Sequence, residues 1–343
     1  MAFPSTVEVE NLSPEEMERA YLEYRRACYD IVCRNCMEHG VFSLLASPCT
    51  AAEFCARMEV VPGKAHVAQL LLDALVKYGA VQVSADDPPR YQAVPGGPPR
   101  TDFDEGLIFV ATGKRSVAEL RHSENYAGIL KSLTVETNPV SAAFDAENLT
   151  LWEEVLQAPF YRYSRVQAVR QIAEAGPHLL DCACGPGFGL QELGELAPEG
   201  AGATVLGIEI SDDFVVSAVK RAADDPRVRV VHGDLEAPQD FLQEGYFDGA
   251  MIVGAYHFLR EPEQLWATVA RLLRPGGTFC IAYVLSKVGT YDQEIMDLRF
   301  ALRHPPSYQP TRDDVLRLAG RSNMDLTREF GLGAWRWYSF TRR

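Results

Sequence analysis

Residues 179–189 read LLDCACGPGFG, and this stretch decides the class of fold that the chain can adopt. An apolar run leads into Asp181, and Gly185, Gly187 and Gly189 then occupy alternate positions. Because glycine permits sharp turns and lets a ligand approach the backbone closely, the stretch predicts a buried strand followed by a ligand-binding turn. The same arrangement is typical of dinucleotide-binding sites, so the turn alone leaves the ligand open.

Two carboxylates narrow the choice of ligand. Asp181 lies just before the glycine turn, where it would repel a diphosphate and attract an α-amino group. Glu209 ends the apolar run 204–210, at the distance from the turn that is expected of a ribose-binding carboxylate. Its two oxygens can accept both ribose hydroxyls, and its charge would reject a 2′-phosphate.

From His178 onward, short apolar runs alternate with stretches of helical periodicity. The predicted strands cover residues 179–182, 204–210, 228–231, 247–253 and 278–285, and predicted helices include 212–223 and 262–273. This alternation predicts a parallel sheet with helices on both faces. A helix over 311–321 follows, and residues 326–330 and 335–341 are expected to form an antiparallel pair.

Two further strand ends carry candidate site residues. Asp234 follows the third predicted strand, where its carboxylate could accept a hydrogen bond from an adenine amino group, and Leu235 comes next. Gly254 ends the fourth predicted strand, and His257 lies three residues beyond it.

The first hundred residues predict helices and a small β-wing. Thr50 and Glu53 form a capping box before one helix, a longer apolar helix is expected over 65–78, and wing strands over 81–91. This is the order of a winged helix. The third helix and the wing carry as many acidic as basic residues, so a packing or dimerisation module is favoured over DNA binding.

Length, charge and cysteine content further limit the classes of protein to which the chain can belong. The chain has 343 residues, which favours more than one packed unit, and a net charge of −14, which disfavours nucleic-acid partners. No run of eighteen apolar residues and no signal peptide are found, so we expect no membrane span and a cytoplasmic location. The eight cysteines are scattered, and Cys33 and Cys36 with His39 lack a fourth ligand, so no metal site is predicted.

The order and spacing of these motifs over about residues 160–343 resemble class I methyltransferases, which use S-adenosylmethionine (SAM) as cofactor. The resemblance implies an α/β fold: a Rossmann-like seven-stranded sheet with an antiparallel last strand, preceded by a mostly helical, winged-helix-like domain. The N-terminal order is similar to that of small-molecule O-methyltransferases of natural-product pathways, which dimerise through this region. The expected organisation is a dimerisation module (1–100), a helical connector contributing to a substrate pocket (101–175) and a SAM-binding catalytic domain (176–343), in a homodimer.

The resemblance also assigns roles within the cofactor site. It implies that Asp181, Gly185 and Gly187 hold the methionine end of SAM, that Glu209 binds the ribose, and that Asp234 and Leu235 frame the adenine. The neighbouring residues Cys182, Ile210 and Gly254 complete the predicted site.

Two residues are candidates for catalysis. In the resembling O-methyltransferases a histidine near His257 is the general base, a role that suits imidazole because its pKa lies near working pH. The fuller pattern of that family is His-Asp-Trp, whereas this chain has His257-Phe258-Leu259, so a role in lining the pocket stays open. Tyr163 is a candidate for a cation–π contact with the sulfonium of SAM.

The leading hypothesis is methyl transfer from SAM to a small-molecule acceptor, with oxygen as the expected acceptor atom and carbon or nitrogen after it. Two alternatives stay open. One is an enzyme that attacks the γ-carbon of SAM and releases methylthioadenosine. The other is a regulator that uses the winged helix with SAM as effector, which the lack of a net positive charge on the third helix and wing disfavours.

Overall fold

The computed structural model describes residues 6–123, 125–136, 140–141, 144–196, 202–237, 242–304 and 309–343. The chain forms two compact units, each built from separate stretches. Unit 1 comprises Met1–Val7, Ser13–Ala142 and Gly289–Ser307, and unit 2 comprises Glu8–Leu12, Ala143–Val288 and Tyr308–Arg343. The units therefore have other boundaries than residues 100 and 175, and the roles expected of the three predicted segments stay predictions.

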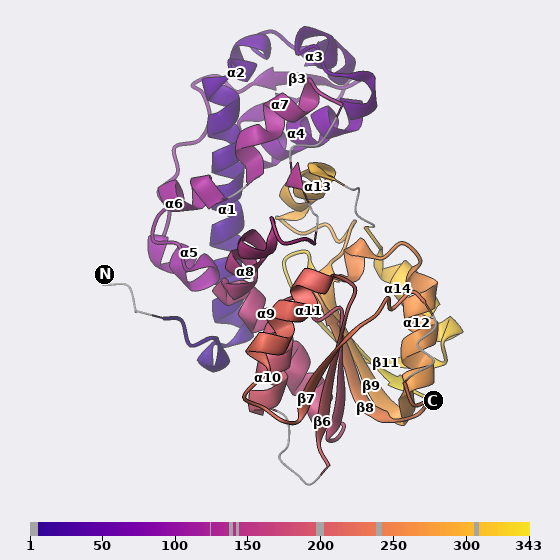
Figure 1. Ribbon diagram of the computed structural model, residues 1–343. Coiled ribbons are helices and arrows are strands. Elements are labelled where there is room, and N and C mark those ends of the chain that lie inside the picture. The colour runs from indigo at the N-terminus through magenta and orange to yellow at the C-terminus, as the bar shows by residue number, and fades with distance from the viewer. Residues whose placement is uncertain are drawn as a thin grey trace. The chain divides into compact units, whose positions relative to one another are not determined.

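Unit 2 is a seven-stranded sheet with helices on both faces (Figure 1). Its strands are β5 (His178–Cys182), β6 (Thr204–Glu209), β7 (Val228–His232), β8 (Phe247–Val253), β9 (Leu273–Val284), β11 (Met324–Leu332) and β12 (Trp335–Arg342). They lie in the order β11-β12-β9-β8-β5-β6-β7, and β12 runs antiparallel to both of its neighbours. The predicted α/β fold with an antiparallel last strand is confirmed.

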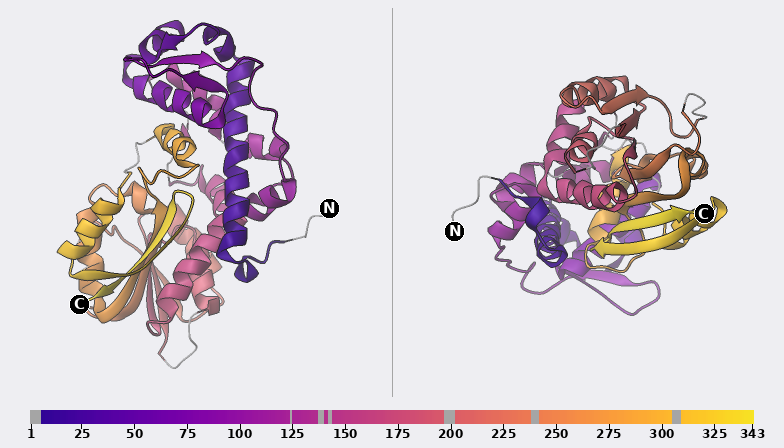
Figure 2. Two further views of the ribbon diagram at one scale, coloured as in Figure 1. Left: turned by 180° about the vertical axis from the view of Figure 1, so that it is seen from behind. Right: turned by 90° about the horizontal axis from the view of Figure 1, so that it is seen from below.

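Helices of unit 2 both precede and connect these strands. They are η1 (Val9–Asn11), α8 (Leu149–Gln157), α9 (Pro159–Ala173), α10 (Phe188–Leu196), α11 (Asp212–Arg221), η4 (Tyr256–Phe258), α12 (Pro262–Leu272) and α14 (Arg312–Arg321). The hairpin of β11 and β12, drawn in yellow, forms one edge of the sheet (Figure 2). Each predicted strand of this half of the chain is present within a few residues of its expected bounds.

One strand begins earlier than predicted. β9 starts at Leu273, which pairs with Phe247, and the next pair is Thr278 with Gly249. Residues 274–277 therefore form an irregularity within the strand rather than a turn before it. The ideal Cβ position on Gly277 would lie 2.9 Å from the carbonyl oxygen of Arg274, so only glycine fits this close approach.

The loop after β8 is anchored in the core. Trp266 of α12 is fully buried, and its Nε1–H donates a hydrogen bond to the hydroxyl of Tyr256 at 2.8 Å. The same indole packs edge-on against Phe279 and Phe340. These contacts hold η4, and with it His257, at the carboxyl end of β8.

Unit 1 contains the N-terminal helices and two small sheets. Its elements are α1 (Pro14–Glu38), α2 (Val41–Leu44), β1 (Cys49–Thr50), α3 (Ala51–Arg57), η2 (Pro62–Lys64), α4 (Ala65–Tyr78), β2 (Val81–Val83), β3 (Arg90–Ala93), α5 (Glu105–Thr112), α6 (Val117–Ser123), η3 (Asn125–Gly128), α7 (Ile129–Leu133), β4 (Val140–Ser141), α13 (Gln293–Ala301) and β10 (Arg303–His304). The capping box of Thr50 and Glu53 is present, and Gly79 ends α4 in the left-handed conformation. Strands β1, β3 and β2 form an antiparallel sheet.

The segment 289–307 joins unit 1 although it follows β9 in the chain. Tyr21 of α1 donates a hydrogen bond to Asp292 at 2.7 Å, and the hydroxyl of Tyr29 donates to the carbonyl oxygen of Tyr291 at 2.8 Å. β10 pairs in parallel with β4. Long-range hydrogen bonds of this kind have no local sequence signal.

The structure also bears on membrane and metal binding. Among the described residues, no helix combines the length and the apolar character that crossing a bilayer requires. Cys33 and Cys36 are buried within α1, and Nδ1 of His39 lies 2.8 Å from the carbonyl oxygen of Asn35. No group of three or more candidate metal ligands occurs among the described side chains.

Candidate functional site

Unit 2 contains a cavity of about 280 Å³ at the carboxyl ends of its central parallel strands. Ligands of open α/β sheets bind in this position, because the connecting loops separate there. Asp181 of β5, Glu209 of β6 and Asp234 beyond β7 all line this cavity. Its apolar wall is formed by Phe144, Trp152, Leu156, Phe188, Phe214, Met251, Phe258 and Leu259.

The cavity collects most of the residues predicted to bind the cofactor. Its lining includes Asp181, Gly185, Glu209, Ile210, Asp234, Leu235 and Gly254. Cys182 and Gly187 are not among the lining residues: Cys182 is fully buried in the core beside Leu180 and Ile252.

Two glycines of the turn are required for different reasons. An ideal Cβ on Gly187 would lie 2.8 Å from the Cα of Ala218, so glycine lets α11 approach the turn. An ideal Cβ on Gly189 would lie 2.4 Å from Oδ2 of Asp181. Gly189 therefore makes room for the carboxylate that faces the cavity.

The carboxylate of Glu209 is held by the backbone. It accepts hydrogen bonds from the amides of Gly185, Ile210 and Ser211, each at 2.9 Å. Burial raises the pKa of Glu209, and these three amides oppose the rise. Since a carboxylate offers about four acceptor positions, one stays available, and accepting both ribose hydroxyls requires the exchange of one backbone bond.

Asp181 is almost completely buried, with 4% of its surface exposed. Burial raises its pKa well above the ordinary value for an aspartate, and the guanidinium of Arg165 opposes this rise. A bound ammonium group would favour the ionised carboxylate further. The site therefore suits a ligand that carries a positive charge at this end.

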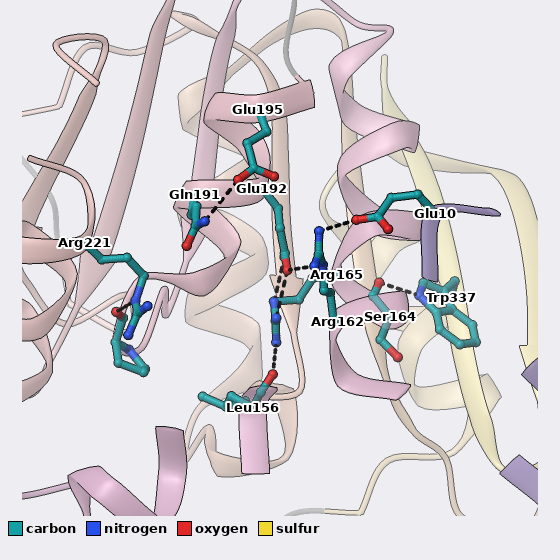
Figure 3. Close-up of polar contacts among 11 residues, drawn as sticks. Glu10, Leu156, Arg162, Ser164, Arg165, Gln191, Glu192, Glu195, Arg221 and Trp337 are labelled. Atoms are coloured by element: carbon teal, nitrogen blue, oxygen red, sulfur yellow. Dashed lines mark hydrogen bonds and ion pairs between the residues drawn. The ribbon is translucent and has the colours of Figure 1, made fainter. Parts of the chain in front are cut away.

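Arg165 of α9 is a site residue that sequence reasoning missed. It is 7% exposed and lines the cavity. Its Nε and Nη2 donate to the two carboxylate oxygens of Glu192 at 2.7 and 2.8 Å, and its Nη1 donates to the carbonyl oxygen of Leu156 at 2.7 Å (Figure 3). It brings a buried cation to the same end of the cavity as Asp181, and no local motif marks it.

Replacing Arg165 with leucine is expected to lower the free energy of unfolding by about 3 kcal/mol, because it removes both charge-assisted hydrogen bonds of the buried Glu192 and leaves it only the more distant Arg162, at 3.9 Å. Chemical denaturation measures the change. Arg170→Leu, on the same helix but exposed and without a contact to Glu192, is the control and should lose less than about 1 kcal/mol. A loss of under 1 kcal/mol in Arg165→Leu would contradict this account of the pair.

The adenine end of the predicted site also carries an arginine. Nη2 of Arg260 donates to Oδ2 of Asp234 at 2.9 Å, and its Nε lies 3.3 Å from Oε2 of Glu236. All three residues line the cavity. Arg260 therefore bridges the loops that follow β7 and β8, a contact that the sequence did not indicate.

An aromatic group closes another part of the wall. Phe144 stacks with Trp152 at 5.3 Å between ring centroids and meets Phe258 edge-on at 4.8 Å. The hydroxyl of Ser211 donates to the carbonyl oxygen of Phe144 at 2.6 Å. Phe144 and Trp152 belong to the segment predicted to contribute to a substrate pocket, and the structure places both in the wall of this cavity.

The two residues predicted to be catalytic lie outside the cavity lining. His257 is 6% exposed, and its ring centroid lies 4.0 Å from that of Phe258, which does line the cavity. Tyr163 is fully buried and meets Trp337 edge-on at 6.4 Å. Their catalytic roles stay predictions.

A Rossmann-like sheet whose carboxyl edge presents carboxylates after three adjacent strands defines a nucleoside-type cofactor site. The comparison with known families makes this class specific: residues 180–281 match the family described as "Methyltransferase domain". This stretch of the chain thus matches a methyltransferase domain, and SAM is the cofactor of that class. The lining of the cavity fits this cofactor, because the buried Asp181 suits a ligand with a positive charge and Glu209 keeps one acceptor position available for a hydroxyl.

Individual relatives match parts of the chain. An "Uncharacterized 37.1 kDa protein in transposon TN4556" of Streptomyces fradiae is 35% identical over 116 residues, which span 34% of this chain and 32% of that protein. "O-methyltransferase cnsE" of Penicillium expansum is 28% identical over 170 residues, which span 48% of this chain and 59% of that protein. The matches therefore span a third to three fifths of these relatives.

Among solved structures, the crystal structure of the CurJ carbon methyltransferase is similar with a TM-score of 0.68 at 14% identity. The similarity covers 97% of this chain and 94% of that chain. At this level of identity, the comparison shows a shared fold.

Proposed function

We propose that this protein transfers the methyl group of SAM to an oxygen atom of a small-molecule acceptor. The observation that carries the proposal is the presence of Asp181, Glu209 and Asp234 in one cavity, after three adjacent parallel strands. In this assignment they meet the ammonium, the ribose and the adenine of SAM. The relative named as an O-methyltransferase supports oxygen, and the similar fold of a carbon methyltransferase makes carbon the alternative.

In this proposal, the residues of the chain position the cofactor and place charged groups around it. SAM supplies a methyl group on a sulfonium; as the acceptor oxygen bonds to this carbon, the sulfur–methyl bond breaks, leaving S-adenosylhomocysteine and a proton. Asp181 and Glu209 orient the cofactor, and the apolar wall excludes water from it. The proton of the acceptor hydroxyl leaves to a base.

We propose His257 as that base, since the loop that holds it also lines the cavity through Gly254, Ala255 and Phe258. His257→Gln is expected to lower kcat at least about 100-fold, because general-base catalysis contributes that much or more. The affinity for SAM should stay within about twofold. A near-normal kcat would leave His257 with a structural role in the loop.

The affinity for SAM is expected to rise with pH. The pKa of Asp181 in the free protein is raised by burial, so the carboxyl is protonated at low pH, and the SAM ammonium binds the ionised form. At pH values below the pKa of Asp181, the binding of SAM therefore releases a proton. The Kd for SAM falls as the pH rises towards this pKa. Calorimetry in two buffers of different ionisation enthalpy measures the release, and Asp181→Asn should reduce it, with any remainder assigned to Glu209, whose pKa burial also raises.

Mass spectrometry of the pure protein with SAM tests the function. Without acceptor, SAM should persist apart from traces of S-adenosylhomocysteine. With a panel of small phenols, enols and amines, S-adenosylhomocysteine and a methylated product should appear in equal amounts, and the fragmentation of the product identifies the methylated atom. Accumulation of methylthioadenosine with turnover would instead make SAM itself the substrate.

We also propose that the N-terminal helices with the β1-β3-β2 sheet form a dimerisation module rather than a DNA-binding one. Its helix α4 carries Lys77 against Asp73, and its wing loop carries Asp86 and Asp87 against Arg90. Light scattering after size exclusion should give twice the mass of 38.0 kDa. A monomer mass, or a mobility shift of DNA at low salt, would contradict the proposal.

A further inference from the structure

The indole of Trp335 carries a buried donor that the fold leaves unused. The side chain begins β12 and is 3% exposed. Its Nε1–H is buried and meets no hydrogen-bond acceptor among the described residues. Burying a polar group without a partner costs free energy, so most such donors in proteins are satisfied by protein, water or ligand.

The position of Trp335 relates it to the cofactor cavity. Trp335 pairs with Val284 at the carboxyl end of β9, on the edge of the sheet where the cavity lies. An ideal Cβ on Gly254, a residue of the cavity lining, would lie 3.8 Å from Cη2 of the indole. The indole therefore lies next to a residue of the cavity wall.

Aromatic rings surround the same indole. Phe160 and Tyr161 of α9 meet it edge-on, with ring centroids at 5.4 and 5.8 Å. Phe160 is buried, whereas Tyr161 is partly exposed. The group thus places apolar rings around one polar donor. Sites for small organic ligands have this composition.

We propose that Trp335, with Phe160 and Tyr161, is the acceptor subsite of the enzyme, and that its Nε1–H donates a hydrogen bond to an oxygen of a planar acceptor. The ligand class is a cyclic, largely apolar molecule with a carbonyl or hydroxyl oxygen. It reaches the indole from the side of Tyr161, the partly exposed member of the group. This inference rests on the proposed function, because it assigns the site to the methyl acceptor.

Two probes of equal shape isolate the hydrogen bond. 1-Tetralone carries a ketone oxygen where tetralin carries a methylene group. Protein saturated with S-adenosylhomocysteine should bind tetralone about three- to tenfold more tightly than tetralin, which is the range expected of one hydrogen bond. Tetralone, and not tetralin, should shift the indole N–H resonance of Trp335 in an amide-correlation NMR spectrum.

Trp337 supplies the matched control. It lies two residues further along β12, and its Nε1–H already donates to the carbonyl oxygen of Ser164 at 3.1 Å (Figure 3). Trp335→Phe should abolish the preference for tetralone and leave the affinity for SAM and the thermal midpoint unchanged. Trp337→Phe should keep the preference and lower the thermal midpoint.

The outcomes separate this inference from the proposed function. Equal affinity of the wild-type protein for the two probes, or binding of neither, overturns the acceptor subsite, whether or not methyl transfer is found. If Trp335→Phe keeps the preference for tetralone, the subsite is likewise overturned. A preference for tetralone that depends on Trp335, together with no methyl transfer to any acceptor, would show a ligand site at Trp335 but overturn both its assignment to the methyl acceptor and the proposed function.

Discussion

Glu209→Ala is expected to weaken SAM binding at least about 100-fold. In the proposed assignment the variant loses a charged acceptor for the ribose, and hydrogen bonds to charged groups contribute about 1.5–3 kcal/mol each. It also leaves the backbone amides of Gly185, Ile210 and Ser211 without the carboxylate that now accepts from them. The glycine turn therefore loses part of its support, and binding at the methionine end weakens with it.

Titration calorimetry with SAM measures the effect. Asp213→Asn is the matched control, since it changes an exposed acidic residue at the start of the next helix and should leave Kd within about twofold. Glu209→Gln keeps the shape of the side chain but not its charge. Its Kd for SAM should lie between those of Glu209→Ala and Asp213→Asn. An unchanged Kd in Glu209→Ala would show that this carboxylate does not bind the ribose.

Gly189→Ala is expected to weaken SAM binding by a similar factor through a steric effect. The added methyl group would lie 2.4 Å from Oδ2 of Asp181 and 3.0 Å from Cε of Met251. Both side chains have to move, and the movement of Asp181 takes the carboxylate away from the cofactor ammonium. Repacking of this kind costs about 1–3 kcal/mol of stability, against which the better helix propensity of alanine recovers about 1 kcal/mol.

Gly320→Ala in α14 is the control for this substitution. Nothing lies within 4 Å of the ideal Cβ on Gly320, and its backbone has an ordinary helical conformation. The control should raise the free energy of unfolding by up to about 1 kcal/mol and leave SAM affinity unchanged. Equal SAM affinity in the Gly189 and Gly320 variants would argue against a cofactor role for Asp181.

Under the proposed function, the charges of the site also favour release of the product. Before transfer, the ligand carries a net positive charge in a cavity with four carboxylates, Asp181, Glu209, Asp234 and Glu236, and the two guanidinium groups of Arg165 and Arg260. Methyl transfer removes the sulfonium charge. The favourable electrostatic energy falls with it, so S-adenosylhomocysteine loses part of the attraction that holds SAM.

Local patterns determined the sheet and the carboxylates at its edge. The apolar runs before Asp181 and Glu209 specify strands, because such runs can only be buried between helices in a parallel sheet. The glycines after Asp181 specify a turn, because few other residues adopt its backbone conformation. Since the carboxyl ends of adjacent parallel strands meet at one edge, the order of strands along the chain brought these side chains together.

Only the tertiary structure decided which other residues join the site. Arg165, Arg260 and Trp152 line the cavity through contacts with residues far away in the sequence, and no pattern within their own helices or loops distinguishes them. The segment 289–307 likewise belongs to unit 1 through hydrogen bonds from Tyr21 and Tyr29. Secondary structure follows from the periodicity of nearby residues, whereas ion pairs, ring contacts and unused donors such as that of Trp335 depend on packing between elements, which one sequence does not encode locally.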